Sequence, residues 1–141
     1  MQKLVVPAHP RESGQGFVEF AISLVFLLIL LAGLVDLGRM FYVYIALREA
    51  AQEGAQYGAL CPNGLSIETR VRQSSDFPID LSDPQVAVNS SVVAAPGTPL
   101  RVEVKYLDFQ LIMPFIGTVL GTQNIEIRAQ ANAVVLQQTC P

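Results

Sequence analysis

The chain has very little of the chemistry that enzymes use. Among its 141 residues there is one histidine, His9, and there are two cysteines. Histidine is the commonest general base and the usual activator of serine or cysteine nucleophiles, so its scarcity argues against acid–base or nucleophilic catalysis. The sequence also lacks a Gly-x-Ser-x-Gly elbow, a phosphate-binding glycine loop and a Cys-x-x-Cys pair. We therefore expect a protein that is not an enzyme and that needs no cofactor.

Charged residues are equally scarce, at 15% of the chain, and the balance is acidic, with a formal net charge of −3 at pH 7. Nucleic acid binding needs a basic surface to neutralise phosphates, so nucleic acid is not an expected partner. Asp76, Asp80 and Asp83 lie close together, but their spacing does not match the alternating oxygen ligands of a calcium loop. We predict no metal site and interpret these aspartates as part of an ordinary solvated loop.

What the chain has instead is one long apolar run without charge, Phe20 to Val35. As a helix, residues 15–35 would span roughly 31 Å, which matches a hydrocarbon core of about 30 Å. Asp36 and Arg39 follow the run at i, i+3 spacing, so on a helix they would form a juxtamembrane ion pair. We predict a transmembrane helix over about 15–38.

The residues before this helix predict its topology. Residues 1–14 are mostly polar, small or proline, and they resemble neither a folded element nor the apolar centre of an ordinary secretory signal. This leader contains Lys3 and Arg11, and basic residues beside a membrane segment tend to stay in the cytoplasm. We expect a single-pass protein with a cytoplasmic N-terminus and an external C-terminal domain. Without the leader, the chain would keep 7 basic residues (9 minus 2) and 11 acidic residues (12 minus 1).

A lone carboxylate, Glu19, stands at the start of the apolar run, five residues after Gly14. A charged carboxyl at bilayer depth is costly unless a partner neutralises it. Cleavage after Gly14 would make Gln15 the first residue and place its α-amine about one helical turn from Glu19. In staggered parallel helices this amine would pair with the carboxylate of a neighbouring subunit, which lets both enter an apolar core. The alternative is a carboxylate favoured by the positive end of the helix dipole, at an interface that water reaches.

These features resemble a known family. The junction of Gly14 and Gln15, followed by Glu19-Phe20, is similar to the processing motif of type IV prepilins in the form used by tight-adherence pili. The continuation through Asp36-Leu37-Gly38-Arg39 and the stretch Ala50 to Ala59 resemble the TadE-like minor pilins, or pseudopilins. The resemblance is specific over roughly residues 12–61 and loose beyond them.

The resemblance implies a function and a set of partners. Proteins of this family are cut by a membrane-embedded aspartic prepilin peptidase, and they take part in assembling a pilus. It therefore implies the peptidase, other pilin-like subunits, the pilus assembly platform and the lipid bilayer as partners, and the bacterial cytoplasmic membrane or an extracellular pilus as the location. The alternative is a singly anchored external binding module that never polymerises. Removal of the leader, and neighbouring genes for a peptidase and an assembly ATPase, would distinguish the two.

The helical pattern continues beyond the membrane segment to about Leu60, because no proline interrupts it. Small residues form two adjacent rows at i, i+4 spacing, and the predicted packing face consists of Ala46, Ala50, Gly54 and Gly58 in one row and Ala51 and Ala55 in the other. Such a thin face lets another backbone approach closely. Each glycine costs a helix about 1 kcal/mol relative to alanine, so a packing partner must compensate. This partner is either the protein's own sheet or a neighbouring helix in a filament.

The C-terminal part predicts a small head domain over 61–141. Cys61-Pro62-Asn63-Gly64 ends the long helix, and a short helix is expected from Ser66, as its N-cap, to about Ser75. Beyond it the apolar period changes to two around 86–92, 101–106 and 125–133, which predicts an antiparallel sheet with one wet and one buried face. The expected fold class is α+β, with one long N-terminal helix over 15–60.

Two features of the head allow two interpretations each. Cys61 and Cys140 bracket nearly the whole domain, and oxidation outside a bacterial membrane predicts a disulfide between them, with two free thiols as the alternative. The segment 109–117 is unusually apolar for a connection between strands. It is either a core-filling loop that covers the sheet edge, or a sticky patch that meets another pilin or the membrane surface.

Overall fold

The structure, a computed structural model, describes residues 14–75, 79–91, 95–113, 121–137 and 140. These residues form two helices, α1 (Gln15–Leu60) and α2 (Gly64–Arg72), and three strands, β1 (Val86–Ser91), β2 (Pro99–Gln110) and β3 (Asn124–Val134). The strands make one antiparallel sheet in the order β1-β2-β3. The predicted α+β class is confirmed.

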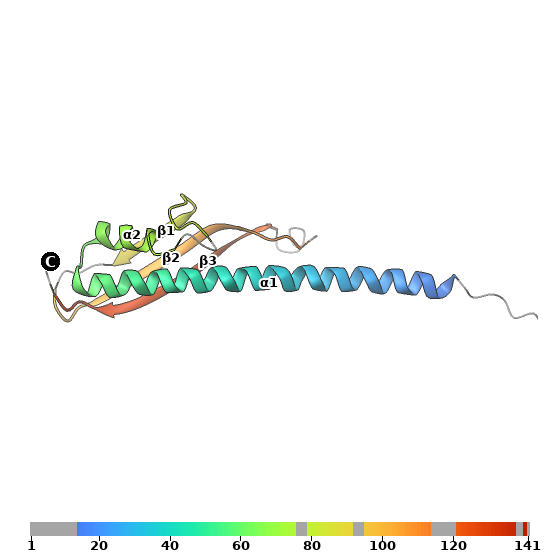
Figure 1. Cartoon of the computed structure of the whole chain (residues 1–141), viewed down its shortest axis with the longest axis horizontal. Helices are drawn as coiled ribbons and strands as arrows, with labels where there is room; N and C mark the ends of the chain where they lie inside the picture. Colours follow the sequence, from blue (N-terminus) through green and yellow to red (C-terminus); the bar gives the residue numbers. More distant parts are fainter. Residues whose placement is uncertain (1–13, 76–78, 92–94, 114–120, 138–139, 141) are drawn as a thin grey trace, which may run out of the picture.

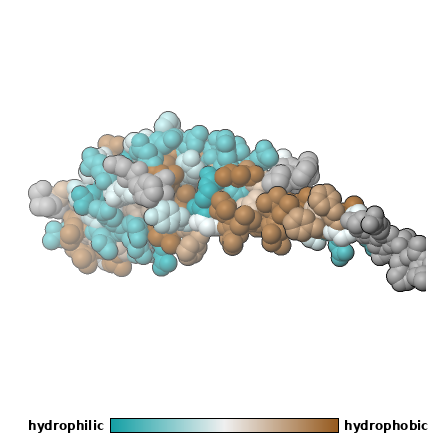
Figure 2. Space-filling view, turned by 45° about the vertical axis from the view of Figure 1, so that its right-hand side comes forward, coloured by the Kyte–Doolittle hydropathy of each residue, from teal (hydrophilic) through white to brown (hydrophobic). Residues whose placement is uncertain are grey.

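The molecule is long because α1 has two different halves. The C-terminal half lies along the sheet and α2, whereas the N-terminal half projects from the head, with no helix or strand of the described residues beside it (Figure 1). The projecting half is apolar on its surface, while the head shows a mixed, largely polar surface (Figure 2). By length and composition α1 is able to cross a membrane. Its most apolar stretch is not buried inside the molecule.

The core of the head is built between α1, α2 and the sheet. Every second residue of β2 points inward, so that Leu100, Val102 and Val104 are fully buried. Two side chains of α2 meet them, Ile67 and Val71, which are spaced one helical turn apart. The facing side of α1 completes the cluster with Val43, Leu47, Ala50, Ala51 and Ala55. The second half of α1 is therefore part of the core of the head.

Strand β2 extends farther than its alternating pattern predicts. The register with β3 runs regularly to Tyr106 opposite Ile127 and then shifts before Phe109 opposite Ile125, which inserts one extra residue into β2. After this bulge Phe109 is again buried, at 3% exposure. The first two residues of the apolar segment 109–117 thus belong to the sheet, and its residues 114–117 lie outside the described part of the chain.

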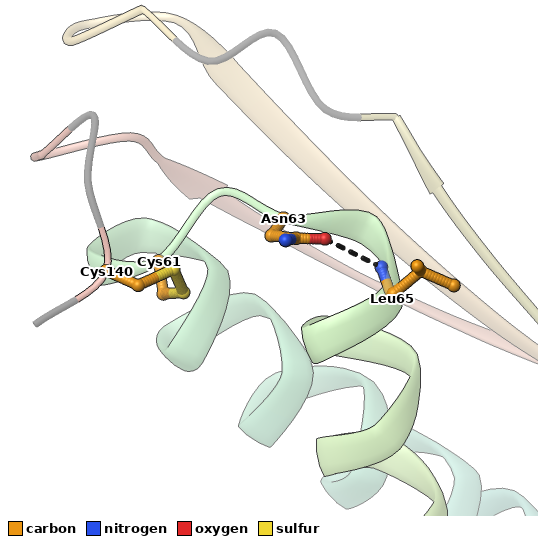
Figure 3. Close-up of a disulfide and its surroundings, with 4 residues drawn as sticks. All are labelled: Cys61, Asn63, Leu65 and Cys140. Atoms are coloured by element: carbon orange, nitrogen blue, oxygen red, sulfur yellow. Dashed lines mark hydrogen bonds between the residues drawn. A yellow bond between two sulfur atoms is a disulfide. The ribbon is translucent and has the colours of Figure 1, made fainter.

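The predicted N-cap of the second helix is wrong. The cap is Asn63 rather than Ser66, and α2 begins at Gly64. Asn63 has an extended backbone, and its Oδ1 accepts a hydrogen bond from the amide of Leu65 at 3.1 Å (Figure 3). Its carbonyl oxygen accepts another from the amide of Ile67 at 3.0 Å. Asparagine provides the same short side-chain acceptor as serine, and it follows the proline that helps to end α1. Ser66 therefore lies inside the helix.

Candidate functional site

The N-terminal end of α1 contains the residues of the predicted processing motif. Gly14 immediately precedes the helix, and its carbonyl oxygen accepts a hydrogen bond from the amide of Val18 at 3.3 Å. Gln15 and Glu19 are both exposed and line one shallow hollow on the helix surface. The helix therefore places Gln15 and Glu19 one turn apart on the same face.

The helix start also bears on the alternative interpretation of Glu19. The first turn of α1 contains no acidic residue, because Glu19 is the fifth residue of the helix. The effect of the helix dipole on a charge falls off within the first turn. The dipole therefore provides little reason for a carboxylate at this position.

At the other end of the apolar run, Asp36 joins the long helix to the head. It is a buried carboxylate, at 3% exposure, although it lies on the part of α1 where the helix emerges from the head. Its Oδ1 accepts a hydrogen bond from the amide of Ile112 at 3.0 Å, and its Oδ2 accepts one from the amide of Met113 at 2.6 Å. Both amides belong to the turn that follows β2, so this single side chain binds the turn to α1.

Arg39 completes the same cluster. Its Nη1 lies 3.3 Å from Asp36 Oδ1, as the i, i+3 spacing predicts, and its guanidinium lies over the ring of Phe109 at 5.1 Å. The same Nη1 donates a long hydrogen bond, 3.5 Å, to the carbonyl oxygen of Gln110. Sequence analysis identified the ion pair but missed the turn that it holds. The available signal was that a buried carboxylate needs several donors, and that an apolar segment follows the second strand.

The face of small residues on α1 packs against the protein's own sheet and α2. Ala46, Ala50, Ala51 and Ala55 are buried, and so are Gly54 and Gly58. At Gly58 an added Cβ would lie 2.7 Å from Ile67 Cδ1 and would overlap Leu100. Glycine at this position thus allows a close approach of α1 to both neighbours. In the structure this face is occupied from within the same chain.

The cysteines lie at the far end of the head. Cys61 directly follows α1, and the structure brings it within disulfide-bonding distance of Cys140, with 4.5 Å between the Cα atoms (Figure 3). Nearby, the amide of Leu136 donates to the carbonyl oxygen of Ala59 at 2.7 Å. The segment after β3 therefore returns to the end of the long helix. Within the described ranges, acidic, histidine and cysteine side chains form no group suited to a metal ion, and Asp76 lies outside them.

Comparison with known proteins finds one similarity, which lies in the long helix. Residues 14–56 match the family model described as TadE-like protein. No curated protein and no solved structure gave a match. The matched range begins at Gly14, includes Glu19, Asp36 and Arg39, and ends before α2 and the sheet. The expected resemblance is confirmed over these residues, so most of helix α1 is similar to TadE-like proteins.

Proposed function

We propose that this protein is a minor pilin-like subunit that takes part in the assembly of a tight-adherence type IV pilus. The observation that carries the proposal is the match of residues 14–56 to TadE-like proteins, which starts at the glycine of the proposed processing junction. The structure adds a long helix with a bare apolar half and a small head at its other end. This architecture suits a subunit that is stored in a membrane and later packs its helix against other helices.

Maturation is proposed to occur by removal of residues 1–14. Cleavage by a prepilin peptidase after Gly14 would give Gln15 a free α-amine, which is a new cation at the end of α1. Glu19 lies one turn away on the same exposed face, where the carboxylate of one subunit can meet the amine of its neighbour. Opposite charges that pair in this way enter an apolar assembly at a lower cost than either charge alone.

The proposed topology assigns each part of α1 to one environment. Residues 15–38 cross the bacterial cytoplasmic membrane, residues 39–60 belong to the external part, and residues 61–141 complete the external head. The change falls just after the uncharged apolar run ends at Val35, where Asp36 and Arg39 bind the head to the helix. The proposed role is mechanical, with other pilin-like subunits, the peptidase and the membrane-embedded assembly platform as partners.

Mass measurement of the protein isolated from cell envelopes tests the processing step. We expect wild-type protein to begin at Gln15, and we expect the variant Gly14→Val to keep residues 1–14, because a bulky side chain would replace glycine at the cleaved bond. Gly16→Ala is the matched control and should be cut normally. An added Cβ meets no atom within 4 Å at either glycine, so neither change should disturb the fold. Wild-type protein that still begins at Met1 would contradict the proposal.

A further inference from the structure

We propose that the head rests on the bilayer through the turn that follows β2, Leu111–Met113, so that the protein contacts lipid at two places, α1 and this turn. The inference rests on the proposed role of α1 as a membrane anchor and adds a second, separate lipid contact. The turn contacts the lipid leaflet on the side of the head.

Asp36 sets the level of the turn relative to the membrane. It is the first charged residue after the apolar run, and a carboxylate is expected at the boundary of the hydrocarbon rather than within it. The two carboxylate oxygens of Asp36 accept hydrogen bonds from the amides of Ile112 and Met113. The backbone of the turn therefore lies at the level of Asp36 along α1. The turn therefore lies at the boundary.

Met113 reaches beyond this level toward the N-terminal end of α1. A Cβ built at Gly33 would lie 3.5 Å from Met113 Sδ and 3.7 Å from its Cε, so the methionine side chain lies against this part of the helix. Gly33 is inside the apolar run, and three residues of helix correspond to about 4.5 Å. The end of Met113 is thus level with side chains of α1 that face lipid in the proposed topology.

Ile112 presents an uncovered apolar side chain at the same place. It is 62% exposed, and on α1 Leu34 and Leu37 are 64% and 59% exposed. A single exposed apolar residue is normal on a protein surface. Here, however, the apolar surface of the projecting half of α1 runs up to the adjoining edge of the head (Figure 2). Ile112 extends a surface that is already proposed to face lipid.

The backbone amides of the turn are paired within the protein, which lowers the cost of placing them beside hydrocarbon. Irregular backbone is tolerated at membrane depth only where its polar groups are satisfied. The amide of Leu111 donates to the carbonyl oxygen of Gln123 at 3.0 Å, and the amides of Ile112 and Met113 donate to Asp36. Three consecutive donors are thus paired within the protein.

The chain contains no tryptophan, so a single introduced tryptophan reports its own surroundings. Ile112→Trp is the test variant, Leu24→Trp in the apolar run is the control for membrane insertion, and Leu65→Trp, at 78% exposure on the head, is the control for a watery position. Each full-length variant is placed in phosphatidylcholine vesicles whose acyl chains are brominated either near the headgroup, to report on Ile112→Trp, or near the chain end, to report on Leu24→Trp. Bromine quenches tryptophan at short range, whereas acrylamide quenches it from the water.

We expect bromolipid to quench Ile112→Trp and Leu24→Trp and to leave Leu65→Trp unquenched. Acrylamide should quench Leu65→Trp more strongly than the other two variants. Quenching of Ile112→Trp should not change with the protein-to-lipid ratio, because lipid is the partner. If only Leu24→Trp is quenched by lipid, the anchor is present and the docked turn is refuted. Protection that appears only at high protein-to-lipid ratios assigns the turn to a second subunit and overturns the inference. If Leu24→Trp is also unquenched, the membrane anchor itself fails.

Discussion

At the scale of single residues, Asp36 is a buried carboxylate that is costly to desolvate and that holds the turn after β2 to α1. Removing a carboxylate from water is costly, and the cost is offset only when donors replace the lost water. Asp36 has three such donors, two amides of the turn and the guanidinium of Arg39. Hydrogen bonds to an ionised acceptor are stronger than those between neutral groups. The residue therefore fixes the turn more firmly than apolar contact alone would.

We predict that Asp36→Ala releases the turn while the rest of the head stays folded. The substitution leaves the amides of Ile112 and Met113 without their acceptor, which costs about 1–3 kcal/mol of local stability. Hydrogen exchange measured in detergent micelles should show faster exchange at these two amides and unchanged exchange at the central strand β2.

Glu49→Ala is the matched control for this experiment, because it removes an exposed carboxylate from the same helix. Surface changes of this kind usually alter stability by less than about 0.5 kcal/mol. Equal exchange of the Ile112 and Met113 amides in wild type and in Asp36→Ala would show that Asp36 does not hold the turn.

At the scale of elements, α1 changes its packing partner along its length. Its projecting half is apolar and exposed, whereas the half within the head carries a face of alanine and glycine against α2 and the sheet. Small residues bring the helix axis close to its neighbours, so the larger Ile67, Val71 and Leu100 fill the space from the other side. The close approach of α1 to α2 and the sheet therefore depends on its two buried glycines, Gly54 and Gly58.

Gly54→Ala should therefore destabilise the head although alanine favours helix. An added Cβ would overlap Val71 Cγ2, and Val71 is fully buried and has one strongly preferred side-chain rotamer in a helix. Overpacking of this kind costs about 1–3 kcal/mol, which exceeds the roughly 1 kcal/mol that alanine gains over glycine in a helix.

Gly38→Ala makes the same change on the same helix where nothing lies within 4 Å of the added Cβ. It should leave the stability of the head unchanged within about 0.5 kcal/mol, because the added methyl group meets no neighbour. Thermal unfolding followed by circular dichroism compares the two variants. A Gly54→Ala variant at least as stable as Gly38→Ala would contradict the tight packing.

The elements that could be predicted from the sequence are those with a regular local pattern. The strands follow from alternation, as in Ile125 to Ala133, and the extent of α1 follows from an unbroken helical pattern. The extension of β2 to Gln110 could not be predicted, because the bulge after Tyr106 interrupts the alternation. The bonds from Asp36 to the turn could not be predicted either, because they join residues 76 and 77 positions apart. Local patterns thus specify elements and leave distant contacts undetermined.

At the scale of the whole molecule, the head is bound to α1 at both of its ends. At the end nearest the projecting half of α1, Asp36 binds the turn after β2, and at the far end the segment after β3 returns to the end of the helix. Both contacts join parts that are far apart in the sequence. Between them lie α2 and the whole sheet, so the head depends on α1 for a wall of its core as well as for its attachment.

The contribution of the Cys61–Cys140 pair to the stability of the head can be measured. The cysteines are 79 positions apart, and in the chain-entropy model a link across a loop of this size stabilises the folded state by up to about 4 kcal/mol. We expect a reducing agent to lower the denaturant midpoint of the wild-type head to that of the double variant Cys61→Ala/Cys140→Ala, and to leave the variant unchanged. A wild-type midpoint that does not respond to reductant would mean that the thiols are free. In that case the bond between Leu136 and Ala59, together with the apolar core, would have to hold the end of the chain.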